Sequence, residues 1–280
     1  MSAILLDGRG LAYTLTESLR QGAKTFTTQH GRPPHLVLIA AGHDTGATVF
    51  GRQVLRASAA IGVVTSLITC APDVIEAEMR DRVAFANDDP TIDGVVVLLP
   101  LPDGVRQRVV TEVLNPAKDV DGLGPRNAGR LLLGYPSFVP GTAEAVITLL
   151  NHYQIPIQGK HAVIVGRSNV GGKPVALQLL QQNATITICH SHTRDLPSIT
   201  RTADILVASV GRIAAITGDM VRPGAVVVDA GINLAPQGYV GDVDVASVAS
   251  IAGWLTPVPG GLGPLTHLMV IRHTVYGPSV

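Results

Sequence analysis

The sequence has few cysteines, few aromatic residues and no excess of charge of either sign. Its 280 residues include 2 Cys, 1 Trp and 4 Phe, and Lys plus Arg equal Asp plus Glu at 21 each. Without a basic or acidic block, the charge gives no support for a nucleic acid or a membrane surface as partner, so a small molecule is the expected ligand. Cys70 and Cys189 lie far apart without metal-ligand spacing, so we interpret both as buried, inert thiols in a reducing compartment.

Long hydrophobic runs, internal repeats and low-complexity tracts are also absent. The first residues, MSAILLDGRGLAYTL, have too short an apolar run for a secretion signal, and nowhere do about 18 apolar residues follow one another. We therefore expect a cytoplasmic protein. Because 46% of the residues are apolar, the chain can fill one large core or two moderate ones.

Seven short β-branched runs are typical of strands, and stretches long enough for helices separate them. The runs lack the alternation of a half-exposed strand, which favours parallel strands covered on both faces. They span residues 35–42, 62–69, 93–102, 161–168, 184–191, 203–211 and 225–231. The sequence therefore predicts an α/β fold with parallel sheets.

The segment 100–142 is rich in Pro, Gly and Asp, which is typical of a link that forms a cleft between two units. We expect a first α/β domain over residues 1–142 and a second domain, of the Rossmann type, over 143–263. The last apolar segment, 264–280, is expected to return as a helix and to complete the first domain.

The stretch HAVIVGRSNVGGKPVALQLLQQNATITICHS has the order strand, glycine turn, helix, strand. Gly166, Ser168 and Gly171 form a variant of the G-x-G-x-x-G turn, in which small residues let the backbone approach a pyrophosphate at the positive end of the next helix. A plain turn that merely needs glycine has a similar pattern. The surrounding strands and helix therefore carry the prediction of a dinucleotide site.

The second strand of this motif ends in Cys189, His190 and Ser191, without the Asp or Glu that usually holds the ribose 2′-hydroxyl of NAD. Arg167 in the turn, together with Ser191, can bind a 2′-phosphate instead, which favours NADP. Arg167 as a solvated surface residue is the alternative. His190 and His192 have no carboxylate or cysteine cluster at metal spacing, so we expect no metal.

Together these residues resemble the methylenetetrahydrofolate dehydrogenase/cyclohydrolase (FolD) family of one-carbon metabolism. The resemblance covers nearly the whole chain. It is carried, in the family's order, by DGVVVLLPLP, PAKDVDGLGPRNAGRL, FVPGTAEAV, VIVGRSNVGGKPVALQLL, PGAVVVDAGIN, GDVD and TPVPGGLGPLT. It implies a folate-binding catalytic domain formed by residues 1–142 and the last helix, a Rossmann domain over 143–263 that binds NADP, and a homodimer formed through the Rossmann domains.

The resemblance also implies site residues on both domains. Asp121 in KDVDG would grip the pterin ring, although an Asp before Gly is by itself ordinarily a turn residue. Lys118 and Asp119 in the same motif can simply solvate the loop. The other implied positions are Pro100, Pro257, Gly260 and Gly261 for the folate, and Thr142, Gly166, Arg167, Ser168, Gly171, Ser191 and Ile232 for the cofactor.

Several polar positions of the family are apolar in this sequence. Phe50, Val54 and Leu98 stand at folate-site positions where the family has Tyr, Lys and Gln. In the family the Lys assists hydrolysis of the methenyl intermediate, and the Gln holds that Lys. Ala47 stands where the family usually has Ser. His43 is the nearby titratable side chain able to replace the lysine, but a role at the helix N-terminus is the expected one.

We therefore expect an NADP-dependent dehydrogenase that oxidises 5,10-methylenetetrahydrofolate to 5,10-methenyltetrahydrofolate by direct hydride transfer, with cyclohydrolase activity lost or strongly impaired. Hydride transfer mainly needs two rings held face to face, whereas opening of the methenyl bridge needs a deprotonated water. The alternatives are a FolD-like protein with a changed one-carbon or pterin substrate, and a non-catalytic folate- or NADP-binding role.

Overall fold

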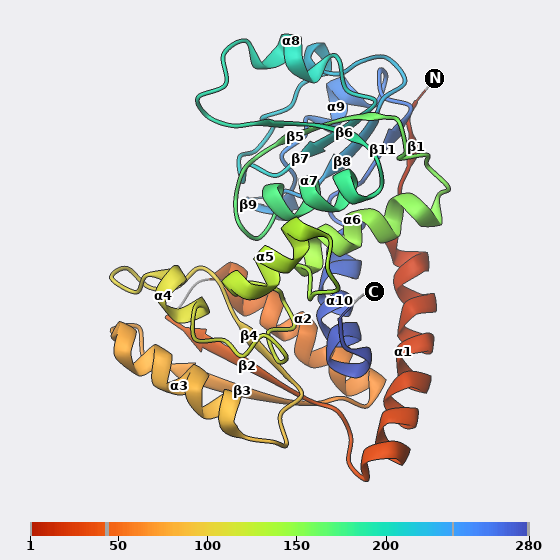
Figure 1. Cartoon of the computed structure of the whole chain (residues 1–280). Coiled ribbons are helices and arrows are strands. Elements are labelled where there is room, and N and C mark those ends of the chain that lie inside the picture. Colours follow the sequence, from red (N-terminus) through yellow and green to blue (C-terminus); the bar gives the residue numbers. More distant parts are fainter. Residues whose placement is uncertain (1, 43–44, 237, 279–280) are drawn as a thin grey trace. The chain divides into compact units, whose positions relative to one another are not determined.

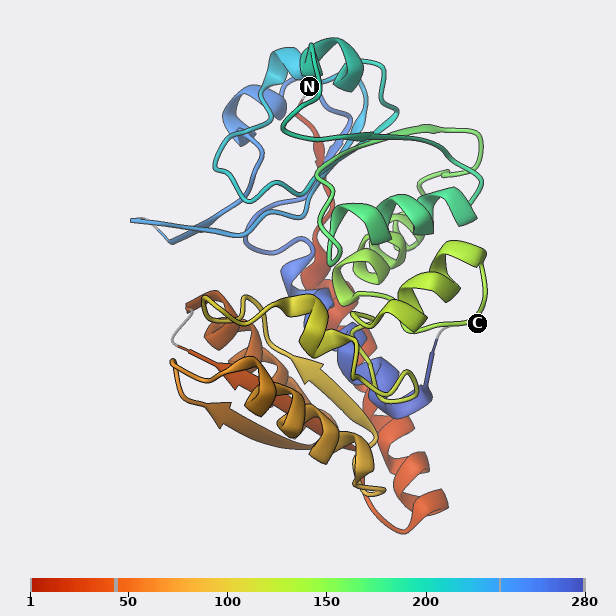
Figure 2. The same ribbon diagram turned by 60° about the vertical axis from the view of Figure 1, so that its left-hand side comes forward.

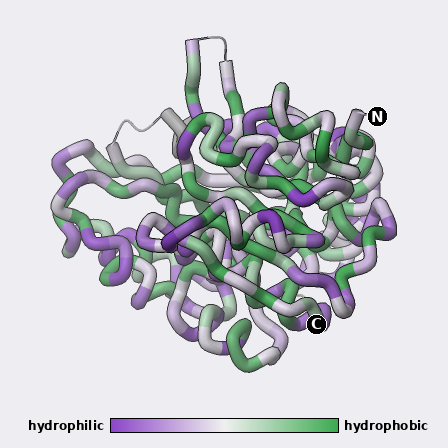
Figure 3. Tube along the Cα trace, turned by 90° about the horizontal axis from the view of Figure 1, so that it is seen from above, coloured by the Kyte–Doolittle hydropathy of each residue, from purple (hydrophilic) through white to green (hydrophobic). Residues whose placement is uncertain are grey.

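The structure, a computed structural model, describes residues 2–42, 45–236 and 238–278. The chain forms two compact units, which Figures 1 and 2 show from two sides. Unit 1 contains Met1–Ala12 and Thr142–Thr266, and unit 2 contains Tyr13–Gly141 and His267–Val280. Figure 3 shows hydrophobic (green) and hydrophilic (purple) stretches alternating along the chain. None of the helices formed by the described residues is long and apolar enough to cross a membrane.

Unit 2 is built on a three-stranded parallel sheet in the order β3-β2-β4. One face of this sheet packs on α3 and α4, and the other face, which carries Leu38 and Leu98, packs on α2 (Figure 2). The elements are β2 (His35–Ala41), β3 (Val64–Cys70), β4 (Gly94–Val97), α2 (Thr45–Ile61), α3 (Glu76–Asp88), α4 (Gln107–Thr111), α5 (Pro125–Leu133), most of α1 (Gly8–His30) and the C-terminal part of α10 (Gly263–Tyr276).

Unit 1 is built on a six-stranded parallel sheet in the order β1-β11-β8-β7-β5-β6. The strands are β1 (Ile4–Leu5), β5 (His161–Val165), β6 (Thr185–Cys189), β7 (Ile205–Ala208), β8 (Val226–Asp229) and β11 (Trp254–Leu255), with a small antiparallel pair β9 (Asn233–Ala235) and β10 (Gly238–Val240). The helices are α6 (Gly141–His152), α7 (Gly172–Gln181), α8 (Leu196–Thr200), α9 (Val245–Val248), the 3-10 helix η1 (Gly218–Met220) and the first turn of α10.

The order of strands in unit 1 reverses at β5, which has β6 on one side and β7 on the other. In open α/β sheets, ligands bind beyond the carboxyl ends of the strands at such a reversal. The sheet therefore presents a candidate ligand site at the ends of β5, β6 and β7.

All seven predicted strands are present, and the prediction of an α/β fold with parallel sheets is confirmed. The prediction that these strands are covered on both faces is wrong for β3 and β6. Most of their residues are exposed or half-buried, and both are edge strands with a neighbour on one side only. The segment 100–142, expected to be a link, contains two helices, α4 and α5, and all of it except Thr142 belongs to unit 2.

The division into units differs from the predicted domains at the N-terminus. β1 pairs in parallel with β11, with Ile4 opposite Trp254, and Leu6 N donates a hydrogen bond to Leu255 O (2.9 Å). Residues 1–12 therefore belong to unit 1 rather than to the domain predicted over 1–142. The division at Thr142 lies one residue before the predicted start of the second domain.

Candidate functional site

The glycine turn after β5 lies at the strand reversal of unit 1. Gly166 has a φ of +134°, and a Cβ added to it would lie 2.1 Å from the carbonyl oxygen of Ser209. Its N–H donates to Cys189 O (2.9 Å), at the end of β6. Because the turn is packed against the ends of both neighbouring strands, no side chain fits at this position. The turn thereby leads directly into α7, so the N-terminus of this helix lies where a dinucleotide is expected to bind.

The side chain of Ser168 forms a hydrogen bond within this turn. Its Oγ accepts a hydrogen bond from Gly171 N (3.0 Å), and a Cβ on Gly172 would lie 2.1 Å from Gly166 O. The turn is thus in backbone contact with the N-terminus of α7. The first N–H groups of a helix have no intrahelical acceptor and carry partial positive charge, so they suit the phosphates of a dinucleotide.

Arg167 lies near the place where the turn meets the end of β6. Burial lowers the pKa of His190, and the positive charges of Arg167 and His192 lower that pKa further. Arg167 therefore lies close enough to act electrostatically on the end of β6, where the exposed Ser191 follows His190. A 2′-phosphate placed there would meet a cation and a hydroxyl donor.

Two buried carboxylates, Asp229 and Asp242, hold the loops that follow β7 and β8. Asp242 is fully buried and accepts four hydrogen bonds of 2.6–3.0 Å, from the backbone N–H groups of residues 210–212 and from Asn233 Nδ2. Burial raises the pKa of Asp229, which accepts hydrogen bonds from the backbone N–H groups of Gly231, Asp242 and Val243. The sequence analysis did not predict this network, although two of its family motifs, PGAVVVDAGIN and GDVD, contain Asp229 and Asp242.

The remaining residues predicted for unit 1 lie in loops or at helix starts. Ile232 is 64% exposed between β8 and β9, and Thr142 is half-buried at the start of α6. Pro257, Gly260 and Gly261 lie in the loop after β11.

That loop packs directly on the first residues of α1. Gly8 N donates to Gly260 O (2.8 Å), and Gly260 has a φ of +121°. A Cβ on Gly261 would lie 2.8 Å from Pro257 O. The backbone packing of this loop therefore requires both glycines, and this requirement does not exclude a role beside the folate.

Asp121, in unit 2, is a carboxylate with a perturbed pKa. Burial raises its pKa to about 6, the hydrogen bond from Gly141 N (3.0 Å to Oδ1) opposes this rise, and the charge of Asp119 adds to it. The carboxyl is therefore mostly ionised at neutral pH and becomes protonated in weak acid.

A solvating role, which the sequence left open for Asp119, is wrong. It is 1% exposed and accepts hydrogen bonds from Leu123 N (3.0 Å), Gly124 N (2.9 Å) and Asn127 Nδ2 (2.9 Å). Burial raises its pKa to about 6. Asp119 therefore holds the turn that carries Asp121.

Lys118 is also structural. Its Nζ donates to the carbonyl oxygens of Asn87 (2.7 Å) and Asp89 (2.6 Å), at the end of α3. Cations are favourable at the C-terminus of a helix, where the last carbonyls have no intrahelical donor. The side chain ties the KDVDG motif to α3, so a solvating role is wrong for this residue too.

The positions of the expected Tyr, Lys and Gln are apolar and well packed in unit 2. Val54 is fully buried, Leu98 is 3% exposed and Phe50 is half-buried. A Cβ on Gly51 would lie 2.9 Å from Leu98 Cδ1, so α2 packs closely on the residue after β4. None of these side chains carries a group that can give or accept a proton. Pro100, two residues further, is exposed.

The structure places Phe50, Val54, Leu98, Pro100 and Asp121 in unit 2, and the other predicted site residues in unit 1. His43 and the side chain of Ala47 lie outside the residues that the structure describes. Cys70 and Cys189 are buried free thiols, and burial raises the pKa of both. Within the described part of the chain, no cluster of three or more His, Cys, Asp or Glu could hold a metal ion.

Models of a single family match both parts of the chain. The catalytic domain of tetrahydrofolate dehydrogenase/cyclohydrolase matches residues 6–121, and the NAD(P)-binding domain of the same family matches residues 140–278. The prediction of a dinucleotide-binding domain is thereby confirmed.

Individual proteins agree with these matches. The bifunctional protein FolD of Roseiflexus sp. (strain RS-1) is 44% identical over 276 residues, which cover 98% of this chain and 96% of the relative. The crystal structure of the bifunctional enzyme FolD from Campylobacter jejuni is 35% identical, with a TM-score of 0.94 over 99% of this chain and 98% of that one. The Trypanosoma brucei N5,N10-methylenetetrahydrofolate dehydrogenase-cyclohydrolase, complexed with NADP cofactor and inhibitor, is 32% identical, with a TM-score of 0.92 over 98% of this chain and 96% of that one. This chain therefore belongs to the tetrahydrofolate dehydrogenase/cyclohydrolase family, as its motifs predicted.

Proposed function

We propose that the chain is an NADP-dependent 5,10-methylenetetrahydrofolate dehydrogenase whose cyclohydrolase activity is lost or strongly impaired. The observation that carries the proposal is the buried apolar set at Val54 and Leu98, with Phe50, in a chain that retains the glycine turn and Asp121. The relatives described above are named as bifunctional enzymes. The proposal is therefore that this chain keeps one of two activities.

Oxidation of the folate mainly requires positioning. A C–H bond of the bridging methylene carbon breaks, and its hydrogen leaves with the electron pair as a hydride for C4 of the nicotinamide, while a folate nitrogen lone pair stabilises the cation. Holding two reactants in the productive geometry lowers a barrier by about 7–11 kcal/mol. Hydride transfer therefore does not need an ionisable side chain at positions 50, 54 or 98.

Hydrolysis of the methenyl bridge has different requirements. The attacking water must lose a proton, and a ring nitrogen must later gain one. General acid and base groups typically contribute a factor of about 10² to 10⁴ to such steps. The hydrocarbon side chains of Val54 and Leu98 cannot move a proton, so we expect this contribution to be missing.

Asp121 is proposed to bind the pterin. One of its oxygens, Oδ1, accepts the N–H of Gly141, and an ionised carboxylate has further lone pairs for the N–H groups of a pterin ring. In unit 1, Arg167 and Ser191 are proposed to hold the 2′-phosphate of NADP, because the guanidinium forms charge-assisted bonds with phosphate.

A homodimer formed through unit 1 is part of the proposal. β6 is an edge strand of the sheet, and Ile188 on this strand and Leu180 on α7 are 41% and 54% exposed. Apolar side chains beside an open strand edge suit contact with a second copy. The mass measured by sedimentation equilibrium should be twice that of the 29.2 kDa chain.

Two assays on the same purified protein test the function. Initial rates of NADPH or NADH formation from 5,10-methylenetetrahydrofolate should show turnover with a preference for NADP. The absorbance of 5,10-methenyltetrahydrofolate should decay at the rate of the buffer alone. Fast enzyme-dependent decay contradicts the loss of cyclohydrolase activity, and tight folate binding without NADPH formation contradicts the dehydrogenase and supports a binding role.

A further inference from the structure

His273, on α10, is tied to the turn that carries Asp121. His273 is 1% exposed, and its Nδ1 lies 2.7 Å from the carbonyl oxygen of Val120, which is 153 residues earlier in the chain. Because a carbonyl oxygen only accepts, Nδ1 carries the hydrogen and donates it. The C-terminal helix is thereby bonded to the residue between Asp119 and Asp121.

The same ring contacts the segment that hydrogen-bonds Asp121. The centroids of His273 and Phe138 are 5.4 Å apart, with the rings tilted by 58°. Phe138 precedes Gly141, whose N–H donates to Asp121 Oδ1, and a Cβ on Gly122 would lie 2.5 Å from Phe138 O. The two segments that fix Asp121 therefore lie against each other, and His273 contacts both.

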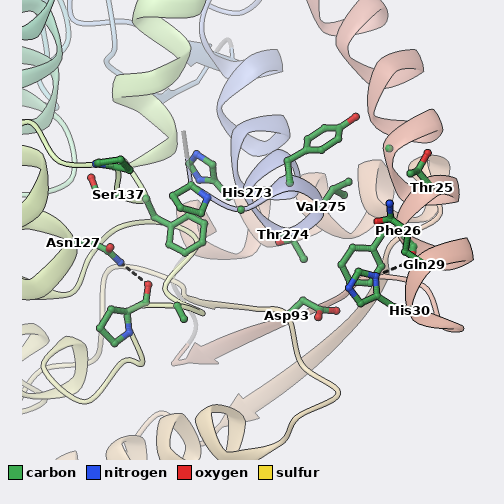
Figure 4. A pocket seen from close by; sticks show the side chains of 18 of the residues that line it. Thr25, Phe26, Gln29, His30, Asp93, Asn127, Ser137, His273, Thr274 and Val275 are labelled. Atoms are coloured by element: carbon green, nitrogen blue, oxygen red, sulfur yellow. Dashed lines mark hydrogen bonds between the residues drawn. The ribbon is translucent and has the colours of Figure 1, made fainter. Parts of the chain in front are cut away.

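A cavity, rather than further protein, lies behind this arrangement. His273, Phe138 and Asn127 all line a cavity of about 930 Å³ within unit 2. Figure 4 shows the His273 ring projecting from α10 toward the side that carries Ser137 and Asn127, opposite Phe26 and His30 of α1.

We propose that His273 is a positioning residue for Asp121. Its hydrogen bond to Val120 O and its contact with Phe138 fix the 119–122 turn in the conformation in which the Asp121 carboxylate binds folate. The inference rests on the proposed role of Asp121 in folate binding. His273 itself is not proposed to touch either ligand.

Three substitutions separate positioning from general packing. His273→Phe keeps a ring beside Phe138 and removes the donor, whereas His273→Asn keeps a donor close to the place of Nδ1. Thr274→Val is the matched control, because Thr274 is also buried on α10 but donates to Val270 O of its own helix (3.0 Å). His273→Leu, a smaller side chain without a donor, takes the place of His273→Phe if that variant does not fold.

The first readout is the split between the KM values of the two ligands. We expect His273→Phe to raise the KM for methylenetetrahydrofolate about tenfold and to leave the KM for NADP nearly unchanged, because only the folate-side turn loses a buried hydrogen bond. His273→Asn should stay within about threefold of the wild type, since it retains a donor. Thr274→Val should change neither KM.

The second readout, hydrogen exchange of residues 119–123 and 137–141 without ligand, does not depend on activity. Exchange there should be faster in His273→Phe and close to the wild type in His273→Asn. The inference is overturned if His273→Phe leaves the exchange or the folate KM unchanged, or raises both KM values equally. It is also overturned if exchange and the folate KM in His273→Asn do not return toward the wild-type values. A wild type without turnover contradicts the proposed function instead, and exchange then decides the role of His273.

Discussion

Replacing Asp242 by Asn tests whether a buried carboxylate holds the loops on the cofactor side of unit 1. Each of its oxygens accepts two of the four hydrogen bonds from residues 210–212 and Asn233. Asn places an NH₂ group at one of these oxygens, where it meets two donors and accepts from neither. A buried donor without an acceptor costs about 1–3 kcal/mol, so the free energy of unfolding should fall by about 2–6 kcal/mol.

Trp254 makes this loss measurable for unit 1 alone. It is the only Trp in the sequence, and it lies in β11 of the same sheet. A chain with two compact units need not unfold in one transition, so a probe confined to one unit is required. Urea titrations followed by Trp254 fluorescence should show a lower midpoint for Asp242→Asn, and the KM for NADP should rise with it.

Asp204→Asn is the matched control in the same unit. Asp204 accepts a hydrogen bond from His161 N (3.0 Å) and pairs with Arg222, but its side chain is 30% exposed. Water can replace the lost partner there, so we expect a loss of about 1 kcal/mol or less. A loss for Asp242→Asn no larger than that of the control would refute the reasoning, because it would mean that relaxed backbone or water satisfies the two donors that lose their acceptor.

Dehydrogenase kcat/KM should decrease below about pH 6, because the pKa of Asp121 is raised to about 6 and its protonated carboxyl is a weaker acceptor for the pterin. A kcat/KM profile that stays flat to about pH 5 would contradict this. The carboxyls of Asp119 and Asp121 bind more protons in the folded than in the unfolded state between pH 3.8, the ordinary pKa, and about pH 6. Their contribution to the free energy of unfolding therefore decreases as the pH rises through that window, which urea titrations at several pH values can measure. Arg167→Gln should raise the KM for NADP about tenfold and leave that for NAD nearly unchanged in initial-rate assays, and equal changes would remove the 2′-phosphate role. The double variant Val54→Lys, Leu98→Gln should accelerate the decay of methenyltetrahydrofolate by a factor of about 10² to 10⁴, and Val54→Lys alone is the control. An unchanged decay rate in the double variant would contradict the importance of these two positions.

The long strands were predictable because each is an uninterrupted β-branched run that one stretch of sequence encodes. β1 and β11, in contrast, have two residues each and exist because Ile4 and Trp254 pair across almost the whole chain. No local pattern shows that partnership. For this reason the sequence predicted the sheets but did not show that residues 1–12 pack with unit 1.

The same distinction applies to the candidate site. The glycine turn was predictable because Gly166 and Gly171 lie within one short motif between a strand and a helix. Asp242 was missed because its backbone donors lie 30–32 residues earlier, and His273 because its acceptor lies 153 residues earlier. Asp119 shows the limit most clearly: an Asp in a Gly-containing turn has the same local sequence whether it is solvated or, as here, 1% exposed.

The apolar residues at the expected Lys and Gln positions also stabilise unit 2. Val54 and Leu98 are 0% and 3% exposed, and burial of such a side chain is worth about 1.5–3 kcal/mol relative to exposure. Val54→Lys alone would bring an ammonium into this space, where desolvation lowers its pKa, whereas the added change Leu98→Gln would supply an amide oxygen as acceptor. An apolar pair needs no such partner. We therefore expect the two positions to be coupled, because either polar residue alone would leave a buried group unsatisfied. The apolar packing that stabilises this part of unit 2 also leaves it without a group that can activate water.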